Sequence, residues 1–205
     1  MLKPHGSDTL NPLYVADDAK RAALTEEAAG LKSIVVSSAA AANAVMMGSG
    51  YFNPLTGYMN LADSMAVSEK MVMTGGLFFP VPVVNVVEDA SGIEAGMRIA
   101  LLDPNVDGNP VLAIQTVDAV ETATDEQMAF MTKKVFATDD MEHPGVKAFN
   151  TVGKTFISGP IEVLNYSYFA ADFPDTFRTA MQIRELIEKN GWEKVVAFQT
   201  RNPMH

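Results

Sequence analysis

Five side chains that can bind an anion fall within the last seven residues of the chain. They are Gln199, Thr200, Arg201, Asn202 and His205. Arginine offers a planar fork of donors that matches a tetrahedral oxyanion, and the amide side chains offer neutral donors. The histidine stands where a following helix would begin, and the first amides of a helix favour phosphate. The stretch predicts an oxyanion or phosphate site; the alternative is a polar strand-to-helix turn with a solvated arginine.

The element expected to position these side chains is the apolar run at residues 195–198. It is continuous, mostly β-branched or aromatic and bounded by polar residues, which predicts a short buried strand. Upstream, we expect a helix that begins at Pro174 and stops at Gly191. A helix, a buried strand and a polar turn make half of a doubly wound unit, whose ligands bind at the carboxyl edge of the sheet.

The chain before about residue 168 has a different character, with many short strands and two or three helices. This pattern predicts an α+β or barrel-like module. The expected helices are residues 17–30, residues 39–47 and a helix capped by Thr124 with Gln127. The expected strands are residues 34–36, 77–87 (irregular because of two prolines), 99–102 and 111–120 (a hairpin), 155–157 and 161–164.

Two other polar or aromatic stretches could carry function. The loop at residues 51–59 is interpreted as a packed loop whose aromatic residues cover the core, with a surface facing a partner domain or ligand as the alternative. The cluster Asp139, Asp140, Glu142 and His143 contains metal-ligand types, but it runs into a Pro-Gly pair. A solvated turn is favoured there over a metal site.

Composition narrows the class of protein. The chain has 205 residues, 48% of them hydrophobic, and no cysteine, which excludes disulfides and thiol chemistry. The net charge is -10, and because residues 151–205 are balanced, the whole acidic excess lies in residues 1–150. This argues against a nucleic-acid binder. The uncharged interval 33–62 is interrupted by polar residues and glycines, and the N-terminus is polar, so we expect a soluble protein without a signal peptide.

Several motifs in order along the chain resemble those of the ATP sulfurylases (sulfate adenylyltransferases). The final QTRNPMH resembles the opening of that family's signature, which continues to a second histidine. Ser7 stands where the family has a second glycine, which leaves the role of His5 open. The supporting matches are Pro4-His5-Gly6, Phe52 to Met59 (FNPLTGYM), Phe79 to Pro82 (FPVP), His143 to Val146 (HPGV) and Gly191-Trp192.

The resemblance implies a fold and a reaction. It implies a PUA-like β-rich domain at residues 1–168 and the beginning of a Rossmann-like nucleotidyltransferase domain at residues 169–205, that is, α+β followed by α/β. The implied reaction joins ATP and sulfate into adenosine 5'-phosphosulfate and pyrophosphate, and sulfur oxidisers run it in reverse. Mg²⁺ would travel with the nucleotide, without protein ligands in this chain.

Residue roles are carried over by motif. Gln199 and Arg201 would hold sulfate, Thr200 and Asn202 would line the reacting centre, and His205 would contact the nucleotide phosphates. The resemblance further implies a cytoplasmic homo-oligomer, and a chain that is incomplete and inactive alone. The rival interpretations are another nucleotidyltransferase and a non-catalytic PUA-like module for binding or oligomerisation.

Overall fold

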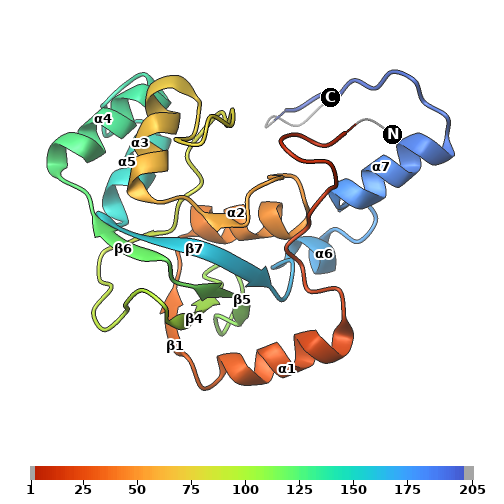
Figure 1. Cartoon of the computed structure of the whole chain (residues 1–205), viewed down its shortest axis with the longest axis horizontal. Coiled ribbons are helices and arrows are strands. Elements are labelled where there is room, and N and C mark those ends of the chain that lie inside the picture. Colours follow the sequence, from red (N-terminus) through yellow and green to blue (C-terminus); the bar gives the residue numbers. More distant parts are fainter. Residues whose placement is uncertain (1–2, 201–205) are drawn as a thin grey trace.

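The computed structural model describes residues 3–200, which form a mixed sheet with helices on both faces (Figure 1). In this part of the chain seven strands join in the order β1-β4-β5-β7-β2, with β3 and β6 also paired to β7. The strands are β1 Lys32–Val35, β2 Gly57–Tyr58, β3 Val86–Val87, β4 Arg98–Leu102, β5 Val111–Thr116, β6 Ala119–Thr122 and β7 Thr155–Val163. The helices are α1 Asp18–Ala28, α2 Ser38–Gly48, α3 Leu61–Lys70, α4 Asp125–Phe136, α5 Pro144–Thr151, α6 Phe169–Asp172 and α7 Ala180–Lys189.

Strand β7 is the centre of the sheet, because it pairs antiparallel with β2, β3, β5 and β6. The expectation of two strands on either side of Gly159 is wrong. Gly159 adopts a φ of +132°, which turns the backbone without ending the strand, and a Cβ there would lie 2.1 Å from the Thr116 carbonyl oxygen. Glycine is therefore required where the bent strand passes the end of β5.

The predicted hairpin between residues 99–102 and 111–120 is confirmed, with one change. Strands β4 and β5 pair antiparallel, but the second predicted strand divides into β5 and β6. The division falls at Val117 and Asp118, whose amides donate to the carbonyls of Met97 and Ser158. The chain thus turns a corner here, and each half pairs with a different part of β7.

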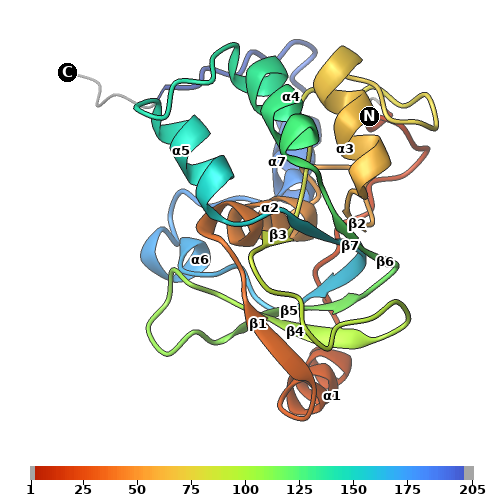
Figure 2. The ribbon, with the colours of Figure 1, turned by 90° about the vertical axis from the view of Figure 1, so that its left-hand side faces the viewer.

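Two helices cover opposite faces of the sheet (Figures 1 and 2). Helix α2 is rich in alanine and buries Ala40, Ala41 and Ala44, which lets it pack closely on β7. On the other face, Leu24 and Ala28 of α1 form a smaller cluster with residues of β4 and β5. Both helices were predicted from sequence. Asp17 caps α1 by accepting from Lys20 N, and Ser37 caps α2 by accepting from Ala40 N.

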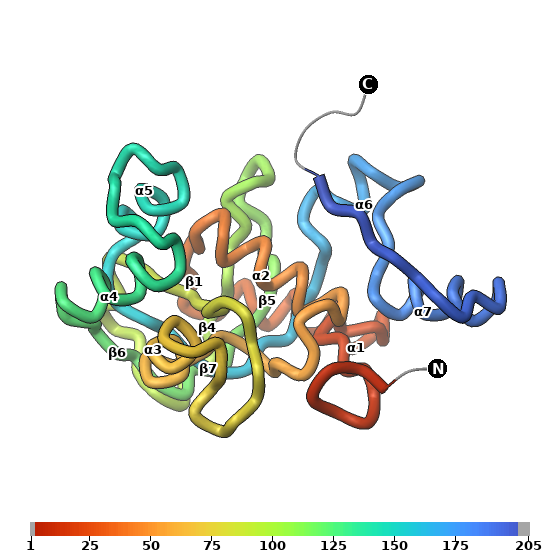
Figure 3. The backbone as a smooth tube through the Cα atoms, turned by 90° about the horizontal axis from the view of Figure 1, so that it is seen from above, coloured from red at the N-terminus to blue at the C-terminus, as the bar shows by residue number. Residues whose placement is uncertain are grey.

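Helices α3, α4 and α5 gather at one end of the molecule, as Figure 3 shows from above. The predicted capping box of α4 is confirmed, since Thr124 and Gln127 bond reciprocally. Helix α5 was not predicted. Its first residue is Pro144 and its N-cap is His143, a favourable start for a helix because proline lacks only an amide that has no partner there.

The C-terminal segment lies at the other end. Helix α7 begins at Ala180 rather than at Pro174, because residues 174–178 form a turn around Arg178 and Thr179 provides the cap. The predicted buried strand at 195–198 is wrong for this structure: Val196 is 92% exposed and Phe198 79% exposed. A strand needs a neighbour to receive its hydrogen bonds, and no strand within residues 3–200 pairs with this run. None of the helices in the same range has the length and apolar character needed to cross a bilayer.

Candidate functional site

The predicted anion-binding residues divide between described and undescribed parts of the chain. Gln199 and Thr200 are exposed and follow an extended stretch that leaves α7. Arg201, Asn202 and His205 lie outside the described residues. The structure therefore tests the elements that lead to the site, and not the geometry of the five side chains together.

Helix α7 is the last regular element before these residues, and its start is well defined. The Thr179 hydroxyl accepts from Gln182 N, and the Gln182 side chain accepts from Thr179 N, which makes a second capping box in the chain. At its end, Gly191 adopts a φ of +63°, which is the left-handed stop expected from the sequence. The helix is mostly exposed, and Met181, Ile183 and Leu186 are each 37–40% accessible.

Contacts from the loop after α2 hold the start of α7. The Ala180 amide donates to the Ser49 carbonyl at 2.9 Å, and the Tyr51 hydroxyl donates to the Arg178 carbonyl at 2.8 Å. Phe177 packs against Tyr166, with ring centroids 5.2 Å apart. The interpretation of 51–59 as a packed loop is confirmed for Leu55, Tyr58 and Met59, which are buried in the core. Tyr51, at the start of the loop, contacts the C-terminal segment.

Three of the sequence motifs, distant along the chain, meet at the buried side chain of Asn53. Its amide nitrogen donates to the His5 carbonyl and to the Ser7 hydroxyl, both at 2.7 Å, and its oxygen accepts from Asn11 N at 2.8 Å. Phe52 beside it packs edge-on against Phe79, with centroids 5.8 Å apart. The N-terminal segment, the loop at 51–59 and the segment around Phe79 therefore form one structural unit.

His5 has a structural contact in this unit. Its Nε2 lies 2.7 Å from the Phe78 carbonyl oxygen, so this nitrogen carries the hydrogen and donates, and its ring meets the Phe78 ring edge-on. Gly6 follows with a φ of +69°, and a Cβ there would lie 2.8 Å from atoms of both Leu77 and Pro54. The His5 side chain is exposed. Its contacts therefore explain where it lies without assigning it a role in a reaction.

Two tyrosines with perturbed acidity belong to the core rather than to a site. Burial raises the pKa of Tyr58 far above its ordinary range, and its hydroxyl donates to the Ala40 carbonyl of α2 at 2.7 Å. Burial also raises the pKa of Tyr166 to about 12, and this ring stacks on Tyr14 with centroids 4.4 Å apart. Both stay neutral at physiological pH. Tyr58 serves as a packed hydrogen-bonding group and Tyr166 as a packed aromatic ring.

The acidic cluster before α5 is used for turns and caps. His143 Nδ1 accepts from Val146 N at 3.3 Å, and Asp140 accepts from Glu142 N at 2.9 Å. Asp139 lies 3.9 Å from Lys133, and both are largely exposed. Within residues 3–200, no group of three or more His, Cys, Asp or Glu side chains is arranged to hold a metal ion.

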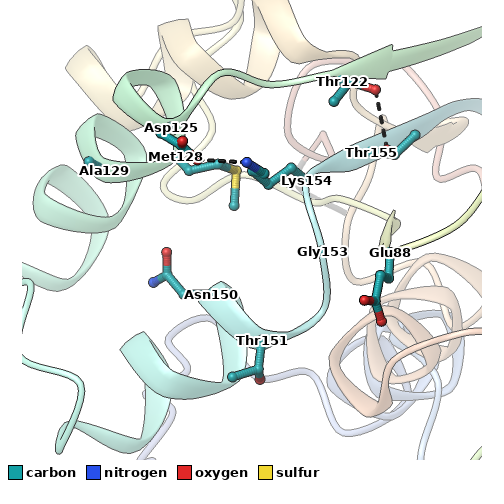
Figure 4. Close-up of a pocket in the computed structure, with 10 residues that line it drawn as sticks. All are labelled: Glu88, Thr122, Asp125, Met128, Ala129, Asn150, Thr151, Gly153, Lys154 and Thr155. Carbon is teal, nitrogen blue, oxygen red and sulfur yellow. Dashed lines mark hydrogen bonds and ion pairs between the residues drawn. The ribbon is translucent and has the colours of Figure 1, made fainter.

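A polar cavity of about 520 Å³ lies between α4, α5 and the ends of β6 and β7 (Figure 4). Its cation is already paired, since Lys154 Nζ lies 2.6 Å from Asp125. Asn150, which also lines it, bonds to Thr132 and to the Val146 carbonyl. No sequence motif pointed to this cavity, and it lies at the end of the molecule away from α7 (Figure 3).

Comparisons with known proteins match the whole chain. The family model described as PUA-like domain matches residues 2–166, and the model described as ATP-sulfurylase matches residues 174–205. The chain is 58% identical over 205 residues to sulfate adenylyltransferase of Allochromatium vinosum, covering 100% of this chain and 52% of that protein. It is 57% identical to the protein of the same name from Alcanivorax borkumensis, covering 51% of it. The chain spans about half the length of the curated relatives it matches.

A solved structure has the same fold. The hexameric APS kinase from Thiobacillus denitrificans aligns with a TM-score of 0.73 and 26% identity, covering 100% of this chain and 35% of that one. Together with the family matches this confirms the predicted fold class, a PUA-like α+β part followed by the start of a nucleotidyltransferase-like part. The chain therefore belongs to the PUA-like domain family and corresponds to the N-terminal portion of the ATP sulfurylases.

Proposed function

We propose that the chain contributes the N-terminal domain and part of the active site of a sulfate adenylyltransferase. The reaction joins ATP and sulfate into adenosine 5'-phosphosulfate and releases pyrophosphate. One observation carries the proposal: the similarity to sulfate adenylyltransferases extends over all 205 residues and includes the polar motif that begins at Gln199.

The chemistry needs no protein nucleophile. A sulfate oxygen attacks the α-phosphorus of ATP in line, the new S–O–P linkage forms, and the bond to pyrophosphate breaks. Catalysis then consists of positioning two anions and stabilising the charge that develops between them. Gln199 and Arg201 are proposed to hold sulfate, Thr200 and Asn202 to line the reacting centre, and His205 to contact the nucleotide phosphates.

We also propose the division of the chain at residue 168, with a PUA-like domain at 1–168 and the start of the catalytic domain at 169–205. The two family matches, which leave residues 167–173 between them, support this boundary. The proposed partners are ATP, carried in with its Mg²⁺, together with sulfate, adenosine 5'-phosphosulfate and pyrophosphate. The net charge of -10 weighs against nucleic acid as a partner.

A cytoplasmic homo-oligomer completes the proposal. The hexameric state belongs to the structural neighbour, and it supports oligomerisation here only as a likeness of fold. The absence of cysteine is consistent with a reducing compartment.

The test uses the longer protein, at the length of the relatives, and measures ATP formed from adenosine 5'-phosphosulfate and pyrophosphate. Arg201→Ala is expected to lower kcat/KM at least about a thousandfold, because a charge-assisted fork is lost from the transition state. Lys189→Ala removes an exposed cation from the end of α7 and is expected to leave activity unchanged. Normal kinetics in Arg201→Ala would contradict the assignment of the site.

Two further assays distinguish the rival functions. Molybdate should provoke futile ATP hydrolysis, since only an enzyme that adenylates sulfate accepts this analogue productively; no response would favour a different nucleotidyltransferase. The 205-residue chain alone is expected to form no ATP, because the relatives are about twice as long. ATP formation by this chain alone would overturn that expectation.

A further inference from the structure

The loop between β4 and β5 carries an unassigned motif. Asp103, Asn105, Asp107 and Gly108 occupy the spacing D-x-N-x-D-G, which is the first half of a calcium-binding loop. The glutamate that closes such a loop in helical calcium-binding proteins is replaced by Ile114, which is buried in β5. The motif therefore lies in a β-hairpin and would need other ligands to complete a site.

Asp103 is fully buried although the loop after it is exposed. Its Oδ1 accepts from Asn105 N at 2.9 Å, which turns the carboxylate toward the loop. Its Oδ2 is also buried and has no hydrogen-bond partner among residues 3–200. An ionised oxygen without a partner in the interior is costly, so a compensating positive charge is expected beside it.

The hairpin residues around Asp103 contain no such charge. Residues 99–120 contain no lysine, arginine or histidine. None of the ion pairs within the described part of the chain includes Asp103 or Asp107. A bound cation would supply the positive charge that neither these hairpin residues nor these ion pairs give to Asp103.

Hydrogen bonds to α2 and within the hairpin hold the loop at residues 103–110 in place. The Ser38 hydroxyl, at the start of α2, donates to Asn105 Oδ1 at 2.7 Å, and the Asp103 amide donates to the Pro110 carbonyl at 2.9 Å. Figure 3 shows the loop beside α2. A carbonyl oxygen has two lone pairs, so Asn105 Oδ1 can still accept a cation while it bonds to Ser38.

We propose that residues 103–109 bind one hard divalent cation, with Ca²⁺ favoured over Mg²⁺. Asp103 Oδ2 would be the inner ligand, and Asp107, the Asn105 amide oxygen and backbone carbonyls would supply the rest. Such a site has two carboxylates, those of Asp103 and Asp107, rather than three or more. Ca²⁺ accepts irregular sets of carbonyl and carboxylate oxygens, whereas Mg²⁺ demands a near-ideal octahedron. With two charged ligands, Kd should be on the order of 0.1–1 mM.

The experiment titrates CaCl₂ into the metal-free 205-residue chain and follows binding heat and Tm. We expect one saturable site per chain and a rise in Tm of about 3–5 °C at ten times Kd. Asp103→Asn keeps the acceptor for Asn105 N but removes the charge, and it should abolish both effects. Asp107→Asn, at an exposed position, should weaken binding at least about tenfold and serves if the first variant fails to fold.

Asp89→Asn is the matched control. Asp89 also accepts an amide two residues ahead, from Ser91 at 2.7 Å, but it is exposed and outside the motif. It should leave calcium binding unchanged. An equal Tm rise in all variants would show that calcium only screens the net negative charge, and absence of a saturable site up to about 10 mM, well above the expected range, would overturn the proposal. An equal response to Mg²⁺ would overturn the preference for calcium.

Discussion

The side chain of Asn53 makes three hydrogen bonds to residues that are distant in the sequence. It is 5% exposed and bonds to residues 5, 7 and 11, which are more than 40 positions away in sequence. Asn53→Ala should destabilise the chain by about 2–3 kcal/mol, because it removes the three hydrogen bonds that tie residues 5, 7 and 11 to a buried side chain. Urea unfolding measures this change.

Ser7→Ala is the control for that prediction. It removes one acceptor from the same network, together with the exposed hydrogen bond that the Ser7 hydroxyl donates to the Thr9 carbonyl, and it should cost under about 1 kcal/mol. Equal losses in the two variants would show that the N-terminal segment is not held through Asn53.

Glu162 predicts a dependence of stability on pH. Its carboxylate lies 2.8 Å from Lys20 Nζ and 3.1 Å from Arg98, and the hydrogen bond from Lys20 is the main cause that holds its pKa below the ordinary value of 4.5. Because the folded-state pKa is depressed, the stabilisation is present above pH 4.5 and is lost as the pH falls through the folded-state value. Glu162→Gln should cost about 0.5–1 kcal/mol at pH 7, since the pair is partly solvated, and progressively less as the pH is lowered from 4.5 toward 3.

The measurement is the difference in unfolding free energy between the two proteins across this pH range. High salt should reduce the difference at pH 7 because it screens the ion pairs. A difference that stays constant from pH 7 to pH 3 would mean that Glu162 acts through packing and not through its charge.

At the scale of single residues, the sequence indicated which residue types could carry function, but not which residues contact one another in the fold. His5, Asn53 and Phe79 were each seen to stand in a motif, but their meeting depends on the path of the chain, since His5 bonds to a residue 73 positions away. The charge of Asp103 was visible, but its burial was not, because burial depends on how the hairpin packs against α2.

Among the elements, β7 depends most on one glycine. Gly159→Ala should destabilise the chain by at least about 3 kcal/mol or prevent folding. The new Cβ would clash with the Thr116 carbonyl oxygen, and alanine is strained at the positive φ of this position. Gly76→Ala is matched, since Gly76 also has a positive φ, of +86°, but open space around it.

The control isolates backbone strain, which should cost about 1 kcal/mol on its own. Thermal unfolding of both variants gives the comparison. If the two substitutions cost the same, the close approach of β7 to the end of β5 has no energetic weight.

Elements with local signals were predicted well, and those defined by tertiary contacts were not. Helices α1, α2 and α4 begin at capping residues whose hydrogen bonds span only three residues, so their signals can be read from the local sequence. The unity of β7 and the corner between β5 and β6 are decided by pairing with distant strands. Helix α5 could have been found, because a histidine before Pro144 is a cap followed by a typical first residue.

At the scale of the molecule, the exposed run at 195–198 predicts a difference between two lengths of protein. In the 205-residue chain, Val196→Lys should change stability by less than about 0.5 kcal/mol, because the side chain is 92% exposed. In the longer protein proposed above, the same run is expected to be a buried strand, and the variant should cost at least about 2 kcal/mol.

Unfolding curves of both lengths, each with and without the substitution, provide the test. Val195 is the less exposed neighbour, at 57%, and Val195→Ile is a conservative control that should be tolerated in both lengths. An equal and small effect of Val196→Lys in the longer protein would remove the predicted strand and with it the proposed position of the site.

The place of β7 in the chain also fixes when the fold can be completed during synthesis. Strands β2, β3 and β6 cannot pair until residues 155–163 have been synthesised, and about a hundred residues separate β2 from its partner in β7. Such distant pairing makes folding slow. A nascent chain that has not yet released β7 from the ribosome carries its apolar strands without their common partner, so it should depend on chaperones and be cut readily by proteases. Protection should arrive in one step, once residue 163 has emerged.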